Sequence, residues 1–233
     1  MCVPNLPSPK KPLSASQGVE SGCPGQRLLA LDPVLEPVAG PTLALAFRDN
    51  PINRAVIRGN RARRTVVNTY GMEASLSATR RYSFRRVTRE EPEGLESDLY
   101  DGITGGLLAL DPGGYPSAFP SIGSQLRCLW GQGFRVMHRW GQLYRLLDAC
   151  HPREPHCYLS LLATHPERRR RGIGRALLSA WLRDVDERAM PSYLETDRKE
   201  LLAFYQSAGF AVEREIEAFG TPIWCMSRAA QLR

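Results

Sequence analysis

The 233-residue sequence lacks long apolar runs and paired cysteine motifs, and it has few lysines for a basic protein. No apolar run reaches the roughly 18 residues of a membrane-spanning helix, so the sequence predicts no transmembrane segment. The first residues have no apolar core of signal-peptide length, and we expect a cytoplasmic protein. The shares of apolar and charged residues, 42% and 24%, exclude a collagen-like or wholly disordered chain.

The six cysteines are scattered, and none belongs to a CxxC pair. In a cytoplasmic chain such cysteines are typically reduced and mostly buried. Cys150, His151, His156 and Cys157 cluster in sequence, which leaves a metal site as an alternative. Two prolines separate the two pairs, however, and the spacing fits no common zinc pattern. We therefore predict no metal and interpret the histidines as ordinary loop residues.

Arginine carries most of the positive charge: the chain has 28 arginines and three lysines, a formal net charge of +7 and a pI near 9.3. Ten of the arginines lie between Arg54 and Arg89, where Glu73 is the single acid. We interpret this 54–89 arginine group as a solvated helix face, with an acidic substrate or nucleic acid as alternatives. Few aromatic residues interleave with these arginines, which argues against nucleic acid.

Composition and periodicity divide the chain into two parts. Residues 1–27, rich in Pro, Ser, Gly and Lys, predict a disordered tail. Residues 28–230 form one predicted α/β (α+β) domain, in which residues 51–87 read as helix interrupted at Gly59 and Gly71. Residues 115–150 form a helical insertion with an amphipathic stripe. The predicted elements after it are a strand over 156–164, a helix over 174–188, a strand over 192–196, a helix over 199–208 and two closing strands.

The segment with the clearest chemistry joins the 156–164 strand to the next helix and reads T-H-P-E-R-R-R-R-G-I-G-R-A from Thr164. A helix N-terminus offers unpaired N–H groups and the positive end of the dipole, which suit phosphate. Gly172 and Gly174 let an anion approach the backbone, and arginines surround them. The segment therefore predicts a diphosphate site.

Two other phosphate-binding loops fit this segment less well. A P-loop requires G-K-[ST], which is absent. A dinucleotide fingerprint requires a third glycine where Leu177 stands, although Glu195 lies near the place of a ribose-binding acid.

Arg169, Gly172 and Gly174 fill, in order, the R/Q-x-x-G-x-G/A loop of the GCN5-related N-acetyltransferases (GNAT), which this segment resembles. The flanking elements are similar too: a Y-L-E-T strand, a helix containing F-Y, then A-G-F and a β-pair. The resemblance covers residues 156–228 well and 28–114 loosely. It implies a central mixed twisted sheet flanked by helices, and acetyl transfer from acetyl-CoA, as co-substrate, to a primary amine by direct attack in a ternary complex.

The resemblance also implies roles for individual residues. The 156–164 strand is expected to bulge near Leu162, whose N–H would face the thioester oxygen. Backbone groups of Leu162 and Thr164 would pair with the pantetheine arm, and N–H groups of residues 170–176 would hold the pyrophosphate. Tyr205 would protonate the leaving thiolate. The expected cofactor-binding residues are Leu162, Ala163, Thr164, Arg169, Arg170, Arg171, Gly172, Ile173, Gly174, Arg175 and Ala176.

The sequence departs from the family pattern at two positions, one of which concerns the general base. Ser160 stands where many relatives carry an acid, and Leu201 where many carry an asparagine that contacts CoA. We expect Glu195 to be the catalytic base, with Asp49 and Glu154 as weaker candidates.

The expected partner is a small-molecule or peptide amine, with neither nucleic acid nor membrane. The alternatives are a CoA-binding module without catalysis and a nucleic-acid-binding protein that uses the 54–89 arginine group. The sequence assigns neither the acceptor nor the oligomeric state.

Overall fold

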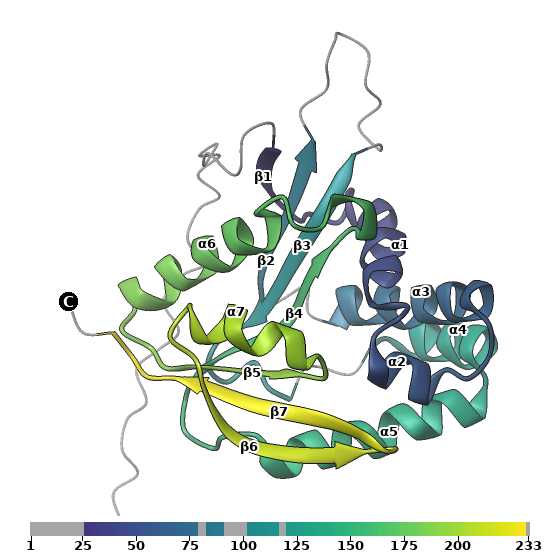
Figure 1. Cartoon of the computed structure of the whole chain (residues 1–233). Helices are drawn as coiled ribbons and strands as arrows, with labels where there is room; N and C mark the ends of the chain where they lie inside the picture. Colours follow the sequence, from purple (N-terminus) through teal and green to yellow (C-terminus); the bar gives the residue numbers. More distant parts are fainter. Residues whose placement is uncertain (1–25, 79–82, 91–101, 117–119, 232–233) are drawn as a thin grey trace, which may run out of the picture.

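A seven-stranded mixed sheet forms the centre of the computed structural model, which describes residues 26–78, 83–90, 102–116 and 120–231 (Figure 1). The strands lie in the order β1-β2-β3-β4-β5-β7-β6, and only the β4–β5 pair is parallel. Their bounds are β1 Gln26–Ala30, β2 Ser83–Glu90, β3 Ile103–Leu110, β4 Cys157–Thr164, β5 Ser192–Thr196, β6 Ala211–Ala218 and β7 Thr221–Arg228. This mixed sheet confirms the predicted fold class.

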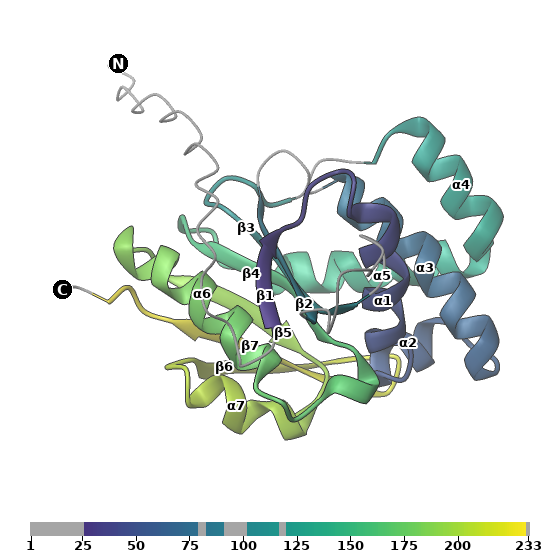
Figure 2. The same ribbon diagram turned by 90° about the horizontal axis from the view of Figure 1, so that it is seen from above.

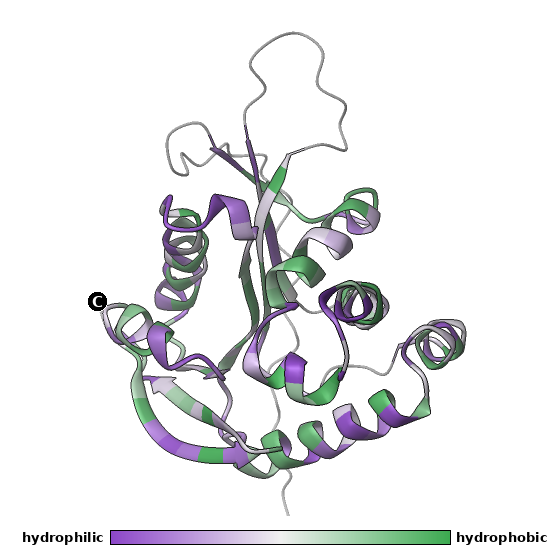
Figure 3. Cartoon of the chain, turned by 45° about the vertical axis from the view of Figure 1, so that its right-hand side comes forward, coloured by the Kyte–Doolittle hydropathy of each residue, from purple (hydrophilic) through white to green (hydrophobic). Residues whose placement is uncertain are grey.

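Helices cover both faces of the sheet, as Figure 2 shows from above. They are α1 Glu36–Phe47, α2 Pro51–Val56, α3 Arg61–Ala78, α4 Ile122–Gln132, α5 Phe134–Cys150, α6 Ile173–Glu187 and α7 Leu202–Gln206. One apolar cluster joins the sheet to α6 and α7, and another joins it to α1 and α3. Viewed along the sheet in Figure 3, α6 lies on one side and α1 and α3 on the other.

The apolar run of β3 follows from its central place in this three-layer arrangement. Leu107 and Ala109 face the α6 side, whereas Leu108 faces α1. Successive side chains of a strand point to opposite faces, so a strand covered on both faces needs apolar residues throughout. All eight residues of β3 are buried.

The helical insertion contains α4 and α5, which pack in different places. Helix α4 lies against α3, where the Cys128 thiol donates to the Tyr70 carbonyl at 3.2 Å. Helix α5 packs against α2 and the β6–β7 hairpin through an apolar cluster that includes Leu143 and Ile223. Among the described residues, no helix is both long and apolar enough to cross a membrane.

Two predictions of local structure need correction. The first strand begins at Gln26, two residues inside the predicted tail, while residues 1–25 lie outside the described part of the chain. The prediction of helix up to residue 87 was wrong from Ser83 onward, because β2 pairs there with β3. Arg85, buried in β2, is paired with Glu36 of α1, which lets a charged side chain face the interior.

Gly71 does not interrupt the chain as predicted but lies inside α3. A Cβ at this position would come within 2.5 Å of the Gln132 amide nitrogen. The absence of a side chain at Gly71 therefore lets the end of α4 approach α3, where Gln132 donates to the Val67 carbonyl at 3.1 Å.

Candidate functional site

The parallel strands β4 and β5 pair only over their first three residues. Cys157, Tyr158 and Leu159 pair with Ser192, Tyr193 and Leu194, and no β4–β5 pairing follows. Beyond this point β4 continues beside β3 to Thr164, and β5 continues beside β7 to Thr196. We call this divergence the fork. Within the described residues, the edge of β4 that faces β5 has no strand partner there, so its backbone groups can pair with an extended ligand.

The fork coincides with an irregularity in β4. Leu108 of β3 pairs with Leu161 and Ala109 pairs with Leu159, which leaves Ser160 as an extra residue. The extra residue reverses the alternation of β4, so Leu159 packs on the α6 side and Leu161 on the α1 side. The predicted bulge near Leu162 is thus centred two residues earlier. Leu162 itself packs toward the α6 side, and Ala163 toward the α1 side.

The loop after β4 leads directly into the N-terminus of α6. Pro166–Arg168 form a 3₁₀ turn, Arg170 takes a φ of +62° and Gly172, the N-cap, takes a φ of +80°. The N–H groups of Ile173, Gly174 and Arg175 belong to the first turn of α6 and so lack partners four residues back. Ala176 differs, because its N–H donates to the Gly172 carbonyl at 2.9 Å. The N–H of Ala176 is therefore less available to a pyrophosphate than those of the three residues before it.

Gly174 lies in open surroundings at the second position of α6. A Cβ built there would meet only the Thr164 hydroxyl, at an ordinary 3.5 Å. The fold therefore does not require glycine at this position for packing. Close approach of a ligand to the backbone would instead account for a glycine at position 174.

The arginines of this loop divide into held and exposed side chains. Glu90 of β2 holds Arg168 at 2.6 Å and Arg171 at 3.9 Å. Arg169 donates to the Ala46 carbonyl, in the last turn of α1, at 2.9 Å. Arg170 and Arg175 are exposed beside the N-terminus of α6. These two arginines are the freer sources of positive charge near the unpaired N–H groups.

Tyr205 lies on the α6 side of the sheet, in the cluster that also contains Leu159 and Leu194. Its side chain is 6% exposed and is packed edge-on against Phe204 and Phe210. Burial, together with the negative charge of Asp197, raises the pKa of the phenol well above its ordinary value. Tyr205 is therefore a protonated phenol throughout the neutral pH range.

Glu195 follows Leu194 in β5 and so points to the opposite face of the sheet, toward the end of α5. Its side chain is only 8% exposed, and its Oε1 lies 3.7 Å from Nδ1 of His151. The His151 side chain is 4% exposed, and its Nε2 lies 3.0 Å from Nε2 of His156. The structure thus joins Glu195 to the two histidines that sequence reasoning interpreted as ordinary loop residues.

Aromatic rings enclose His151. Tyr115 stacks on it at a centroid distance of 3.6 Å, and Tyr158 and Tyr193 contact it edge-on at 4.8 and 4.9 Å. Burial is the main cause that raises the pKa of both Tyr158 and Tyr193, and the Glu195 carboxylate adds to it. Both phenols therefore remain neutral beside Glu195. Sequence reasoning missed this cluster because its members come from separate segments, although H-P-R-E-P-H is a visible signal.

The weaker candidates for the base are placed less favourably. Asp49 pairs with Arg48, Arg61 and Arg64 at 2.6–3.0 Å. The hydrogen bond from Arg61 is the largest of the effects that lower the pKa of Asp49 far below its ordinary value, which makes it a poor base. Glu154 is exposed in the loop that follows α5.

The sulfur atoms of the C-H-P-R-E-P-H-C segment have separate neighbours. The Cys150 sulfur lies 3.8 Å from an Arg214 nitrogen, and the Cys157 sulfur lies 3.4 Å from an Arg188 nitrogen. Among the described residues, no three His, Cys, Asp or Glu side chains are grouped so that they could hold a metal ion.

Part of the 54–89 arginine group is neutralised within the fold. Arg61 and Arg64 share Asp49, and Arg85 is buried against Glu36. Arg80 and Arg81 lie outside the described residues. The group is thus not a single solvated face, because it includes both exposed side chains and structural ion pairs.

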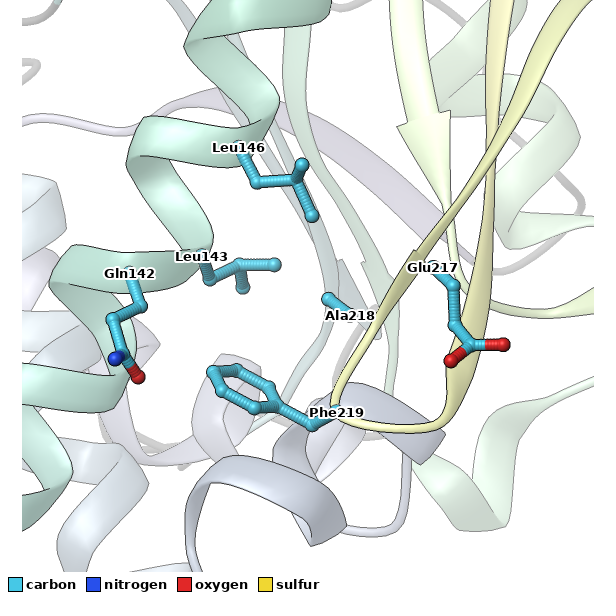
Figure 4. A pocket seen from close by; sticks show the side chains of 6 residues that line it. All are labelled: Gln142, Leu143, Leu146, Glu217, Ala218 and Phe219. Atoms are coloured by element: carbon cyan, nitrogen blue, oxygen red, sulfur yellow. The ribbon is translucent and has the colours of Figure 1, made fainter.

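A separate cavity of about 270 Å³ lies between α5 and the β6–β7 turn (Figure 4). Leu143 and Leu146 line it from α5, and Ala218 and Phe219 line it from the turn, with Gln142 and Glu217 at its sides. Glu195 instead pairs with Cys225, further along β7 from the turn. None of the predicted site residues lines this cavity.

Comparisons with known proteins match part of this chain to a protein family and its fold to solved structures. Residues 133–212 match the family model described as an acetyltransferase (GNAT) domain. This match over residues 133–212 confirms the resemblance seen in the sequence.

Solved structures with this fold include one described as histone acetyltransferase HPA2 and related acetyltransferase from Corynebacterium glutamicum. It has a TM-score of 0.63 at 19% identity, over 88% of this chain and 97% of that one. Arylalkylamine N-acetyltransferase 2 from Aedes aegypti has a TM-score of 0.51 at 14% identity, over 88% and 98% of the two chains. A putative N-acetyltransferase from Lactobacillus plantarum has a TM-score of 0.50 at 14% identity, over 89% and 99%.

Proposed function

We propose that this protein is an N-acetyltransferase that moves the acetyl group of acetyl-CoA directly to a primary amine in a ternary complex. The observation that carries the proposal is the continuity between the fork and α6: the unpartnered edge of β4 leads into the unpaired N–H groups of Ile173, Gly174 and Arg175. An extended arm that ends in a diphosphate fits this succession of donors and acceptors.

The pantetheine arm of acetyl-CoA would pair with the free edge of β4 at Leu162 and Thr164. The diphosphate would accept from the first turn of α6 and gain charge-assisted contacts from Arg170 and Arg175. Arg168, Arg169 and Arg171 would hold the loop in place through Glu90 and the Ala46 carbonyl. The N–H of Leu162 would face the thioester oxygen, where negative charge develops during attack.

Glu195 and Tyr205 lie on opposite faces of the sheet beside the fork. Glu195 would take a proton from the amine so that its nitrogen lone pair can attack the thioester carbon. Tyr205 would give its proton to the departing thiolate, a role for which its raised pKa keeps it protonated. The acceptor would approach from the α5 side, where Glu195 and the aromatic rings lie.

The two alternative functions have less support. A module without catalysis was favoured by the absence of an acid at Ser160, but Glu195 places a buried carboxylate beside the fork. A nucleic-acid surface was favoured by the 54–89 arginine group, but Arg61, Arg64 and Arg85 are in ion pairs with Asp49 and Glu36. The free β4 edge fits CoA binding with or without catalysis, whereas a nucleic-acid surface leaves it unexplained.

A panel of amines tests the proposal: arylalkylamines, polyamines, aminoglycosides, amino acids and peptides with free N-termini. Each is incubated with acetyl-CoA and protein, released thiol is measured, and the acetylated product is identified by mass. We expect at least one class to give amine-dependent release of one thiol per acetyl group transferred. Binding of acetyl-CoA without turnover of any amine would favour the non-catalytic module, and the absence of binding would contradict the proposal.

A further inference from the structure

The proposed reaction must dispose of a proton. A primary aliphatic amine, with a pKa of about 10, enters at neutral pH as an ammonium ion. Its nitrogen loses two protons as the amide forms; one replaces the proton that Tyr205 gives to the CoA thiolate, and the other must reach solvent. A carboxylate with an ordinary pKa of about 4.3 is a weak base for this purpose, whereas an imidazole beside it, at about 6.5, is stronger.

The hydrogen bonds of His156 fix which nitrogen of each ring carries hydrogen. Nδ1 of His156 lies 2.7 Å from the Glu154 carbonyl oxygen. A carbonyl only accepts, so this Nδ1 carries the hydrogen and Nε2 of the neutral ring is an acceptor. The bond of 3.0 Å between the two Nε2 atoms then takes its hydrogen from His151. In a neutral His151 ring, Nδ1 is therefore left without hydrogen.

That bare Nδ1 faces Glu195 inside the protein. It lies 3.7 Å from Oε1 of Glu195, and neither of these two buried atoms has a hydrogen-bond partner among the residues that the structure describes. Two acceptors that face each other in a poorly solvated place are unfavourable without a proton between them. A proton delivered to either atom converts this contact into a charge-assisted hydrogen bond.

We propose that Glu195 and His151 act together as the base, with His151 storing the proton that Glu195 takes from the amine and His156 holding His151 in the accepting tautomer. This proposal deepens the acetyltransferase function and rests on it. An N–H bond of the ammonium breaks as an O–H bond forms at Glu195, and the proton then moves to Nδ1 of His151. After the acetylated product leaves, the proton returns through Glu195 to water, so no oxidation or further reactant is needed.

The groups around His151 are consistent with this role. The titratable groups that face it or adjoin it are Tyr115 after β3, His156 ahead of β4, Tyr158 of β4, Tyr193 and Glu195 of β5, and Asp148 and Cys150 of α5, with Cys225 of β7 beside Tyr193. Burial lowers the pKa of His156, which favours its neutral, accepting form. The raised pKa values of Tyr158 and Tyr193 keep both phenols from competing for the proton.

Nitrogen NMR of histidine-labelled protein tests the tautomers without any turnover. The chain has four histidines, so His151→Gln and His156→Gln spectra assign the two signals. At a pH where both rings are neutral, we expect hydrogen on Nε2 of His151 and on Nδ1 of His156. In His156→Gln the His151 tautomer should become mixed. Hydrogen on Nδ1 of His151 in the wild type would overturn the proposal.

Kinetics test the role in proton transfer. His151→Gln should lower kcat about 100-fold, with unchanged affinity for acetyl-CoA. The dependence of kcat on pH should differ between the wild type and the variant, because the variant lacks the imidazole that stores the proton. With an acceptor that enters as a neutral amine, His151→Gln should lower kcat by a smaller factor than with an ammonium acceptor. His138→Gln, an exposed histidine of α5, is the matched control and should change nothing.

The outcomes separate the two proposals. If the wild type transfers acetyl groups but His151→Gln has the same kcat and pH profile, the role of His151 is wrong and the proposed function stands. If the wild type binds no acetyl-CoA, the proposed function itself fails, and the storage role of His151 fails with it whatever the tautomers are.

Discussion

The two sides of the fork are assembled differently. The α6 side takes its groups from one continuous stretch, β4 through the first turn of α6, with Tyr205 added from α7. The α5 side takes its groups from the loop after β3, the end of α5, β4 and β5. A contiguous motif is legible in a sequence, whereas a cluster from separate segments is visible only in the fold. If the α6 side binds the cofactor and the α5 side removes the proton, a substitution on one side should impair its own task and leave the other task intact.

The largest kinetic effect is expected from Glu195→Gln, which keeps the shape of the side chain but removes the base. We predict a fall in kcat of about 1,000-fold, within the range of general-base catalysis. Acetyl-CoA should bind with unchanged affinity by calorimetry, because Glu195 lies on the α5 side. Glu213→Gln, an exposed glutamate of β6, is the control. A variant that keeps more than a third of the activity would remove Glu195 from the mechanism.

Tyr205→Phe should have a smaller effect of about 10- to 100-fold on kcat, because a thiolate leaves more easily than most groups and needs its proton less. Affinity for acetyl-CoA should change less than twofold. Tyr144→Phe, on an exposed tyrosine of α5, provides the comparison. Initial rates at saturating substrates are the measurement, and an unchanged kcat would make Tyr205 a purely structural residue.

Replacing both Arg170 and Arg175 by glutamine should weaken acetyl-CoA about 10-fold at low salt. The loss should shrink as salt rises, because exposed charges are screened. The rate at saturating acetyl-CoA should remain as in the wild type. Arg145 and Arg153, both exposed, form the control pair. A fall in kcat with unchanged affinity would contradict the separation between the two sides.

Asp49→Asn should have the smallest effect. Asp49 is partly exposed and its pKa is lowered by Arg61, so we expect a loss in unfolding free energy of less than about 1 kcal/mol at pH 7. A lowered folded-state pKa stabilises the fold above the unfolded value of about 3.9, and this stabilisation fades below it. Denaturant unfolding of wild type and variant at pH 7 and pH 3 measures this. A large loss of kcat would instead restore Asp49 as a candidate base.

The parts of the fold that were predictable had short-range signals. The strand, loop and helix from residue 156 to 187 followed from an apolar run, two glycines and an amphipathic stripe. Strand β2 did not, because its arginines resemble a helical surface until Glu36 of α1 is seen to neutralise Arg85. The bulge at Ser160 depends on the register with β3, which no local pattern encodes.

The candidate site was predictable to the same extent. The first turn of α6 and Tyr205 followed from the motif and the resemblance. For the proposed base, Glu195 was expected from the sequence, but the proposed role of His151 depends on a contact between residues 44 positions apart. The N–H of Ala176 is engaged within α6 because of where the helix begins, which sequence patterns place only approximately.

The most direct test of the account is a calorimetric titration of acetyl-CoA into the wild type, Gly174→Glu and Gly123→Glu. Gly123 occupies the second position of α4, as Gly174 does of α6, so the two variants place the same charge in equivalent helix positions. Neither added Cβ clashes with the fold. We predict binding to the wild type and to Gly123→Glu, and at least a 100-fold loss for Gly174→Glu. Equal binding to all three proteins would contradict the placement of the diphosphate at α6.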